Sequence, residues 1–152
     1  ISLLRNRMER IALFPGSFNP FTIGHENIVN RSLTMFDKVI IGIGINSEKS
    51  NDNAKKNLAE IENKYKNEPR VKVITYNTLT ADVVKKENAT CIIRGIRNDV
   101  DLKYESEIAQ VNYTLFNVET IFLLASPELK EISSSLVREL QKFGKKVSDL
   151  LP

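Results

Sequence analysis

Five short apolar runs that alternate with five helix-period stretches restrict the fold of this 152-residue chain more than any other feature. The runs cover residues 10–14, 39–45, 71–75, 91–94 and 120–124, and the stretches cover residues 24–35, 53–66, 80–87, 101–116 and 133–143. Continuously apolar strands separated by helices are typical of a parallel sheet covered on both faces. With right-handed crossovers, this order predicts an α/β fold: a Rossmann-like, doubly wound, five-stranded parallel sheet in a single domain.

Composition excludes several functional classes. No apolar run reaches the roughly 20 residues that a membrane helix needs. The formal net charge is only +3 and the basic residues are dispersed rather than gathered in a stripe. We therefore expect no membrane partner and no nucleic-acid partner.

Residues 1–7 lack the apolar core of a secretory signal, and we interpret them as an extraneous leader before a domain of residues 8–152.

Cys91 is the only cysteine, which excludes an intramolecular disulfide and a multi-thiolate metal site. This composition favours a reducing compartment, and we expect a cytoplasmic protein. Cys91 lies within an apolar run, so we interpret its thiol as a small buried group without a chemical role.

Ligands of doubly wound folds bind at the carboxyl ends of the strands, near the point where the strand order reverses. The loops expected there cover residues 15–23, 46–52, 76–79, 95–100 and 125–132. The first loop runs through Gly16 and enters a helix at Thr22-Ile23-Gly24-His25. Because a helix N-terminus presents free N–H groups and a positive dipole end, this loop is expected to bind phosphate.

Thr22 and His25 are three residues apart, a spacing that places both side chains on one side of the first helical turn. They could therefore flank one phosphate. Gly16 has no Cβ, so a phosphate or an adenosine moiety could approach its backbone closely. A single His in a helix is often structural, but the position of His25 directly after this loop favours a functional role.

These residues resemble the nucleotidylyltransferase superfamily, whose signature is Thr- or His-x-Gly-His, here preceded by Gly16-Ser17-Phe18. Three further segments agree with the phosphopantetheine adenylyltransferase family in order and spacing: Arg94-Gly95-Ile96-Arg97, Asp101-Leu102-Lys103-Tyr104-Glu105 and Ile132-Ser133-Ser134-Ser135-Leu136-Val137. The resemblance implies transfer of the adenylyl group from ATP to 4′-phosphopantetheine with the help of Mg²⁺, giving dephospho-coenzyme A and pyrophosphate in coenzyme A biosynthesis. It also implies a homo-oligomer, typically a hexamer, and coenzyme A as a candidate feedback ligand.

The resemblance assigns roles to individual residues. The catalytic group would be His25, Lys49, Thr22 and Arg97. The ATP contacts would be Ser17, Phe18, His25, Gly95, Ile96, Arg97, Glu105, Ser133, Ser134 and Ser135, with Glu105 near the ribose and Arg138 near the β- or γ-phosphate. The acceptor contacts would be Ser17, Lys49, Leu79, Thr80, Arg94 and Asn112. No protein ligand of the metal is assigned, because Mg²⁺ would be carried by the nucleotide phosphates.

The chain departs from the family at several places. Asn19 stands where the family has Asp, and Leu129-Lys130-Glu131 replaces an aromatic-Ser-Phe run beside the adenine. The chain also ends at Pro152, where relatives continue through one more short helix, so we expect that the C-terminus is incomplete.

Four other functions are weighed against this interpretation. Adenylyl transfer to nicotinamide mononucleotide and cytidylyl transfer to glycerol phosphate use the same loop, but those enzymes generally carry His at the position of Thr22. A noncatalytic nucleotide sensor would retain the fold, although the presence of His25, Lys49 and Arg97 argues against loss of catalysis. A nicotinamide oxidoreductase is set aside because no Gly-x-Gly-x-x-Gly follows the first strand.

Overall fold

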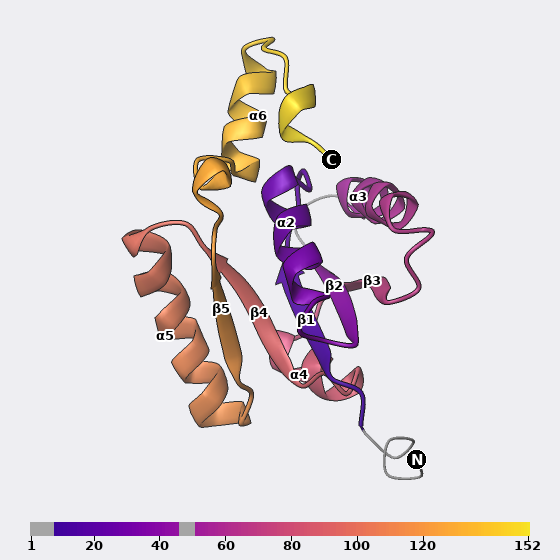
Figure 1. Ribbon diagram of the computed structural model, residues 1–152, viewed down its shortest axis with the longest axis vertical. Helices are drawn as coiled ribbons and strands as arrows, with labels where there is room; N and C mark the ends of the chain where they lie inside the picture. Colours follow the sequence, from indigo (N-terminus) through magenta and orange to yellow (C-terminus); the bar gives the residue numbers. More distant parts are fainter. Residues whose placement is uncertain (1–7, 46–50) are drawn as a thin grey trace.

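The computed structural model describes residues 8–45 and 51–152, and its five strands form one parallel sheet in the order β3-β2-β1-β4-β5 (Figure 1). The strands are β1 (Ile11–Gly16), β2 (Lys38–Gly44), β3 (Val71–Tyr76), β4 (Cys91–Ile96) and β5 (Thr120–Leu124). The helices are α2 (Ile23–Ser32), α3 (Asn51–Lys64), α4 (Thr80–Lys86), α5 (Asp99–Phe116) and α6 (Ser134–Lys142), with short 3₁₀ turns η1 (Pro127–Leu129) and η2 (Ser148–Leu150). The predicted five-stranded, doubly wound fold is confirmed.

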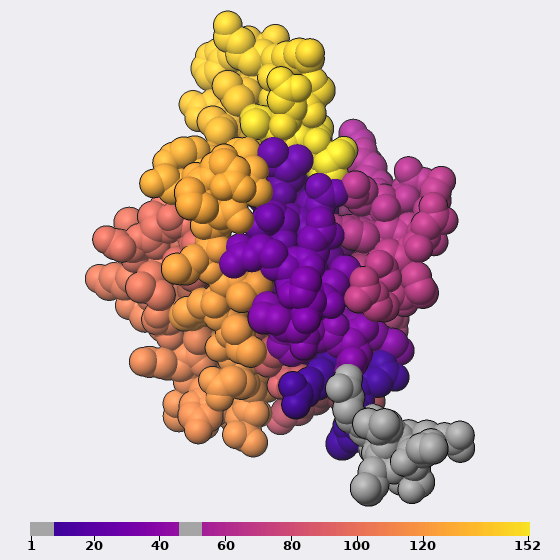
Figure 2. Space-filling model, viewed as in Figure 1, coloured from indigo at the N-terminus to yellow at the C-terminus, as the bar shows by residue number. Residues whose placement is uncertain are grey.

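Helices cover both faces of the sheet because successive strand residues point to opposite sides. Ala12 and Phe14 of β1 belong to a core beneath α2 and α3, whereas Leu13 belongs to a second core beneath α4. Among the described residues, no helix is both long and apolar enough to cross a membrane. Figure 2 shows that the segment from α6 onward forms a projection at one end of the molecule, beside α2.

Two strands extend two residues further than their sequence patterns predict. Pro15 and Gly16 continue β1, because the ladder with β2 runs on to the pair Gly16 and Ile43. Likewise Gly95 and Ile96 continue β4, since that strand pairs with β5 to its end. These residues therefore belong to rigid strand ends and not to loops.

The two central strands separate at their carboxyl ends. β1 and β4 pair only at Ala12 with Cys91 and at Leu13 with Ile92, and no pairing follows beyond those residues. The chain leaves β1 for α2 on one face and leaves β4 for α5 on the other, so this is the point where the strand order reverses. A crevice opens there, as expected for ligand sites in such folds.

Candidate active site

Two adjoining cavities occupy the crevice between β1 and β4. The larger has a volume of about 390 Å³ and is bounded by the ends of β1 and β4 and by the N-termini of α2 and α6. The smaller has a volume of about 190 Å³ and lies against α5, with Thr80, Ile108 and Asn112 in its wall. Pro15, Gly16, Arg94 and Glu105 line both cavities and form their common boundary.

The N-terminus of α2 is closed by a reciprocal pair of hydrogen bonds between Thr22 and His25. The His25 backbone N–H donates to Thr22 Oγ1 at 3.3 Å, and the Thr22 backbone N–H donates to His25 Nδ1 at 3.0 Å. This is a capping box with His at the third helical position in place of the usual Glu or Gln. Because Nδ1 accepts this hydrogen bond, the neutral imidazole carries its proton on Nε2.

The environment of His25 favours that neutral form. Its ring packs against Phe18 and Phe21, with ring centroids 5.0 Å and 5.4 Å away. Burial lowers the pKa of His25 from 6.5 to about 4, and the positive charges of Arg94 and Arg97 contribute to the lowering. Near pH 7 His25 is therefore an uncharged hydrogen-bond donor in the wall of the larger cavity.

Gly16 packs closely against Phe18 in the segment of residues 15–23, which the sequence predicts to bind phosphate and which is called the phosphate loop below. A Cβ at Gly16 would lie 3.0 Å from the ring of Phe18, which is only 3% exposed. Phe18 directs its ring beneath the loop by adopting a positive φ of 47°. The absence of a side chain at Gly16 thus makes room for an internal aromatic ring, in addition to the expected access of a ligand to the backbone.

Arg94 is held between β1 and α5. Its Nε and Nη2 donate to the two carboxylate oxygens of Glu105 at 2.8 Å and 2.6 Å, and its Nη1 donates to the carbonyl of Pro15. Glu105 is only 8% exposed, whereas the Arg94 side chain is 31% exposed, so the carboxylate of this bidentate ion pair is buried and the guanidinium is partly open to solvent.

Arg97 forms a similar but more exposed ion pair with Asp101, which lies one helical turn before Glu105 in α5. Its Nε and Nη2 lie 3.0 Å and 3.3 Å from the carboxylate oxygens of Asp101, which also accepts the Arg97 backbone N–H at 3.1 Å. Asn98 caps α5 by accepting the Asp101 backbone N–H at 2.9 Å. Both arginines of the Arg-Gly-Ile-Arg segment are therefore fixed by acids of one helix.

The three serines at the start of α6 are engaged by the protein. Ser133 caps the helix by accepting the backbone N–H of Leu136 at 3.1 Å. Ser134 Oγ donates to the carbonyl of Pro20 at 2.7 Å. Arg138 Nη1 donates to the carbonyl of Asn19 at 2.6 Å, and its Nη2 donates to Ser135 Oγ at 3.2 Å. These contacts attach α6 to the phosphate loop, with Arg138 directed to a backbone carbonyl.

The predicted contacts are distributed over the two cavities, and Arg94 and Glu105 line both. The larger is lined by the residues expected to contact ATP, except Ile96: Ser17, Phe18, His25, Gly95, Arg97, Glu105, Ser133, Ser134 and Ser135. Thr22 also lines it. The smaller is lined by three residues expected to contact the acceptor: Thr80, Arg94 and Asn112.

Three predicted contacts are placed differently, and the position of a fourth is not described. Ile96 is only 4% exposed and its side chain lies in the interior, away from both cavities. Leu79 is 58% exposed before α4 and lines neither cavity. Ser17, expected to contact both substrates, lines only the larger cavity. Lys49 lies outside the described residues.

Sequence reasoning missed Asp101 and Tyr104 as wall residues, although it noted the segment that contains them. The spacing of four residues between Arg97 and Asp101 was a signal for an ion pair. Tyr104 carried no comparable signal, because its exposure depends on how α5 lies on the sheet.

The expectation for Cys91 agrees with the structure. The thiol is buried, and burial raises its pKa to about 11, as does the nearby charge of Glu119.

Comparison with known proteins agrees with this geometry. The cytidylyltransferase-like family matches residues 13–140. A phosphopantetheine adenylyltransferase from Phocaeicola vulgatus is 49% identical over 144 residues and covers 94% of this chain and 95% of that protein. The protein of the same name from Porphyromonas gingivalis is 48% identical, with 95% of each chain covered.

A solved structure from Vibrio parahaemolyticus, to which nicotinate-nucleotide adenylyltransferase activity is ascribed, superposes with a TM-score of 0.61. The alignment covers 95% of this chain and 94% of that one. At 22% sequence identity, this likeness supports the fold alone.

Proposed function

The chain belongs to the cytidylyltransferase-like family and, within it, to the phosphopantetheine adenylyltransferases, and on that premise we propose that it transfers the adenylyl group of ATP to 4′-phosphopantetheine. The products are dephospho-coenzyme A and pyrophosphate, and the reaction is a step of coenzyme A biosynthesis. The observation that carries the proposal is the pair of adjoining cavities: most of the described ATP contacts line only the larger, the acceptor contacts Thr80 and Asn112 line only the smaller, and Arg94 lies between them.

In this reaction an acceptor phosphate oxygen attacks the α-phosphorus of ATP, and the bond to the pyrophosphate oxygen breaks. That attacking oxygen is already anionic near pH 7, so no general base is needed. The enzyme must instead position two anions and stabilise the charge that develops on the α-phosphate oxygens.

The residues of the larger cavity suit that task. Three kinds of hydrogen-bond donor are available there: His25 Nε2–H, the free N–H groups at the start of α2 and the guanidinium of Arg97. Each of them can donate to a phosphate oxygen in its ordinary protonation state near pH 7. Arg94 lies at the boundary of the cavities, where the acceptor phosphate would meet ATP. Lys49 remains a predicted contact of both phosphates.

Mg²⁺ would enter with ATP. Among residues 8–45 and 51–152, no group of three or more His, Cys, Asp or Glu could hold a metal ion. A metal carried mainly by nucleotide oxygens and water is compatible with such a site, since Mg²⁺ retains much of its hydration. Bound there, it would neutralise charge on the triphosphate.

The outer face of α5 supports a homo-oligomer, for which the family resemblance suggests a hexamer. Large apolar side chains on one side of this helix are exposed, including Val100 at 78%, Val111 at 50% and Leu115 at 68%. Exposed apolar surface of this kind marks association sites. We also propose that the protein is cytoplasmic. We further propose coenzyme A as a feedback ligand, because coenzyme A contains both an adenine nucleotide and a pantetheine arm.

The acceptor specificity can be tested by measuring pyrophosphate release from ATP and Mg²⁺ with three acceptors. We expect turnover with 4′-phosphopantetheine and almost none with nicotinamide mononucleotide or glycerol 3-phosphate, the latter also tested with CTP. Equal or faster release with either rival acceptor would overturn the assignment. Tight ATP binding without turnover on any acceptor would instead favour a nucleotide sensor.

A further inference from the structure

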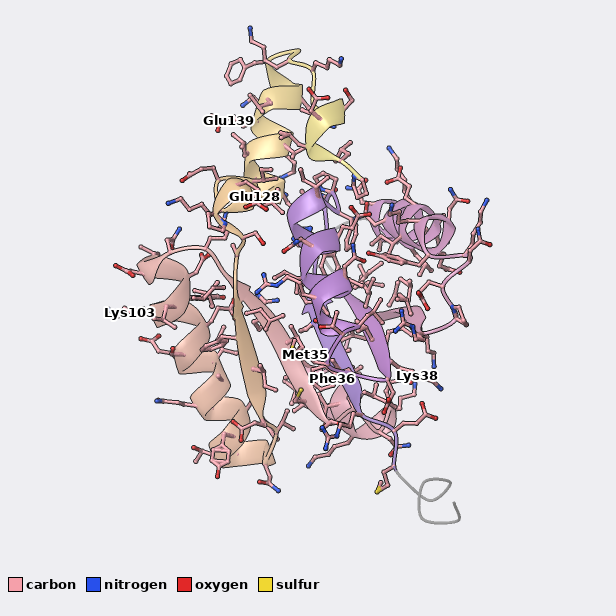
Figure 3. All side chains as sticks on the ribbon, viewed as in Figure 1. Met35, Phe36, Lys38, Lys103, Glu128 and Glu139 are labelled. Carbon is pink, nitrogen blue, oxygen red and sulfur yellow. The ribbon has the colours of Figure 1, made fainter. Side chains whose placement is uncertain are left out.

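Two acids on one side of α5 hold the two arginines of the site. Asp101 and Glu105 are four residues apart, which places both on the same side of the helix. Lys103, between them in sequence, lies on the side of α5 turned away from the sheet (Figure 3). Of the acids on α5, Asp101 and Glu105 line a cavity, whereas Asp99 and Glu107 line neither.

Each carboxylate engages one edge of a guanidinium and leaves other donors available. Arg97 uses Nε and one Nη2 proton on Asp101, so three of its roughly five N–H groups have no partner among the described residues. Arg94 uses two on Glu105 and one on the carbonyl of Pro15. A planar guanidinium held in this way presents its remaining N–H groups in a defined direction.

The two ion pairs occupy different places. Arg97 and Asp101 line the larger cavity only. Arg94 and Glu105 line both cavities, so their pair stands at the boundary where the two substrates would meet. Loss of one carboxylate should therefore affect one substrate, and loss of the other should affect both.

We propose that Asp101 and Glu105 are positioning residues: Asp101 aims Arg97 at the triphosphate of ATP, and Glu105 aims Arg94 at the junction of the two substrates. The inference rests on the proposed function, because it uses the assignment of ATP to the larger cavity and the acceptor to the smaller. It assigns Asp101 a role in the site and extends the role of Glu105 beyond a contact with the ribose.

Two simpler explanations compete with this proposal. Asp101 accepts the Arg97 backbone N–H and places a negative charge at the start of α5, so it could serve the helix alone. Glu105 could bind only the ribose of ATP. The first explanation predicts a change in stability without a selective change in KM, and the second predicts a change in the KM for ATP alone.

The test compares Asp101→Asn, Glu105→Gln and the control Glu107→Gln, which removes the same charge from an exposed position on the same helix. Steady-state kinetics would be measured with each substrate varied, with melting temperatures for all variants. We expect Asp101→Asn to lower kcat/KM for ATP by about tenfold and to leave the KM for the acceptor unchanged. Glu105→Gln should raise the KM for both substrates, and Glu107→Gln should change neither.

A double-mutant cycle gives the decisive readout for Asp101, whose side chain is partly exposed. In an Arg97→Ala background, Asp101→Asn should have no further effect on kcat/KM for ATP. An additional loss of the same size would overturn positioning through Arg97. A Glu105→Gln enzyme with a raised KM for ATP alone would overturn the second half of the proposal. Wild-type protein without pyrophosphate release would instead contradict the proposed function.

Discussion

Two helix N-termini face the larger cavity, and they are built for different tasks. At α2 the cap is made between Thr22 and His25, and the arrangement leaves His25 Nε2–H available to a ligand. At α6 the hydroxyl of Ser134 and the guanidinium of Arg138 are directed to backbone carbonyls of the phosphate loop. From this difference we expect that α2 supplies donors to the reaction, whereas α6 chiefly holds the loop in place.

The largest expected effect concerns His25. His25→Ala should lower kcat on the order of 10²- to 10³-fold, because one donor to the developing charge is lost. ATP affinity, measured by calorimetry, should stay within a few fold. His25→Asn is the matched control for the cap, since its side-chain oxygen can still accept the Thr22 N–H; it should be slow but more stable than His25→Ala. Near-normal turnover in either variant would make His25 structural.

The neutral state of His25 predicts a pH dependence of stability at α2 that α6 lacks. The pKa is 6.5 in the unfolded chain and about 4 in the folded one. As pH falls from about 6.5 to 4, the unfolded chain binds a proton that the folded chain excludes, so stability decreases by roughly 3 kcal/mol at most. In denaturant titrations across this range, the free energy of unfolding should decrease more for the wild type than for His25→Asn as pH falls. Parallel curves would contradict the lowered pKa.

At α6, Arg138→Ala should chiefly reduce stability. Loss of the hydrogen bonds to Asn19 and Ser135 should lower the free energy of unfolding by about 1–2 kcal/mol, since the site is partly solvated. Turnover at saturating ATP should change far less than in His25→Ala. A large decrease in ATP affinity with unchanged stability would show that Arg138 binds phosphate, as the sequence resemblance suggests, and would remove the contrast between the two helices.

The smallest effect is expected at the α6 cap. Ser133→Ala should cost about 1 kcal/mol, because the Leu136 N–H loses its acceptor. Ser133→Asp, which can still cap the helix, should be close to wild type in a thermal melt. If Ser133→Asp weakened ATP binding strongly, Ser133 would lie close to the phosphates of ATP, since a carboxylate there would repel them.

Much of the fold was predictable because apolar periodicity survives in short windows of sequence. The runs at 71–75 and 120–124 lie within β3 and β5. The ends of β1 and β4 were not predictable, because Pro15, Gly16 and Gly95 favour loops locally and are held in strands only by their neighbours across the sheet. The segment from Asp99 belongs to α5 because Asn98 caps it, a signal present in the sequence but not used.

The candidate site was predictable to the level of its residues but not of their partners. His25 and Arg97 were identified from a motif, yet the motif does not state the protonation of one or the carboxylate beside the other. Glu105 was expected at the ribose, and the structure places both of its oxygens on Arg94. Asn19, the departure from the family pattern, offers its backbone carbonyl to Arg138.

The order of strands and helices, the phosphate loop and the arginine segment follow from the sequence alone, because periodicity and capping act over a few residues. Tertiary structure decided the rest. The separation of β1 from β4 made two cavities, and the placement of α5 set Asp101 and Glu105 against the arginines. Burial among Phe18 and Phe21 kept His25 neutral. These features depend on contacts between distant segments and on desolvation, which no local pattern encodes.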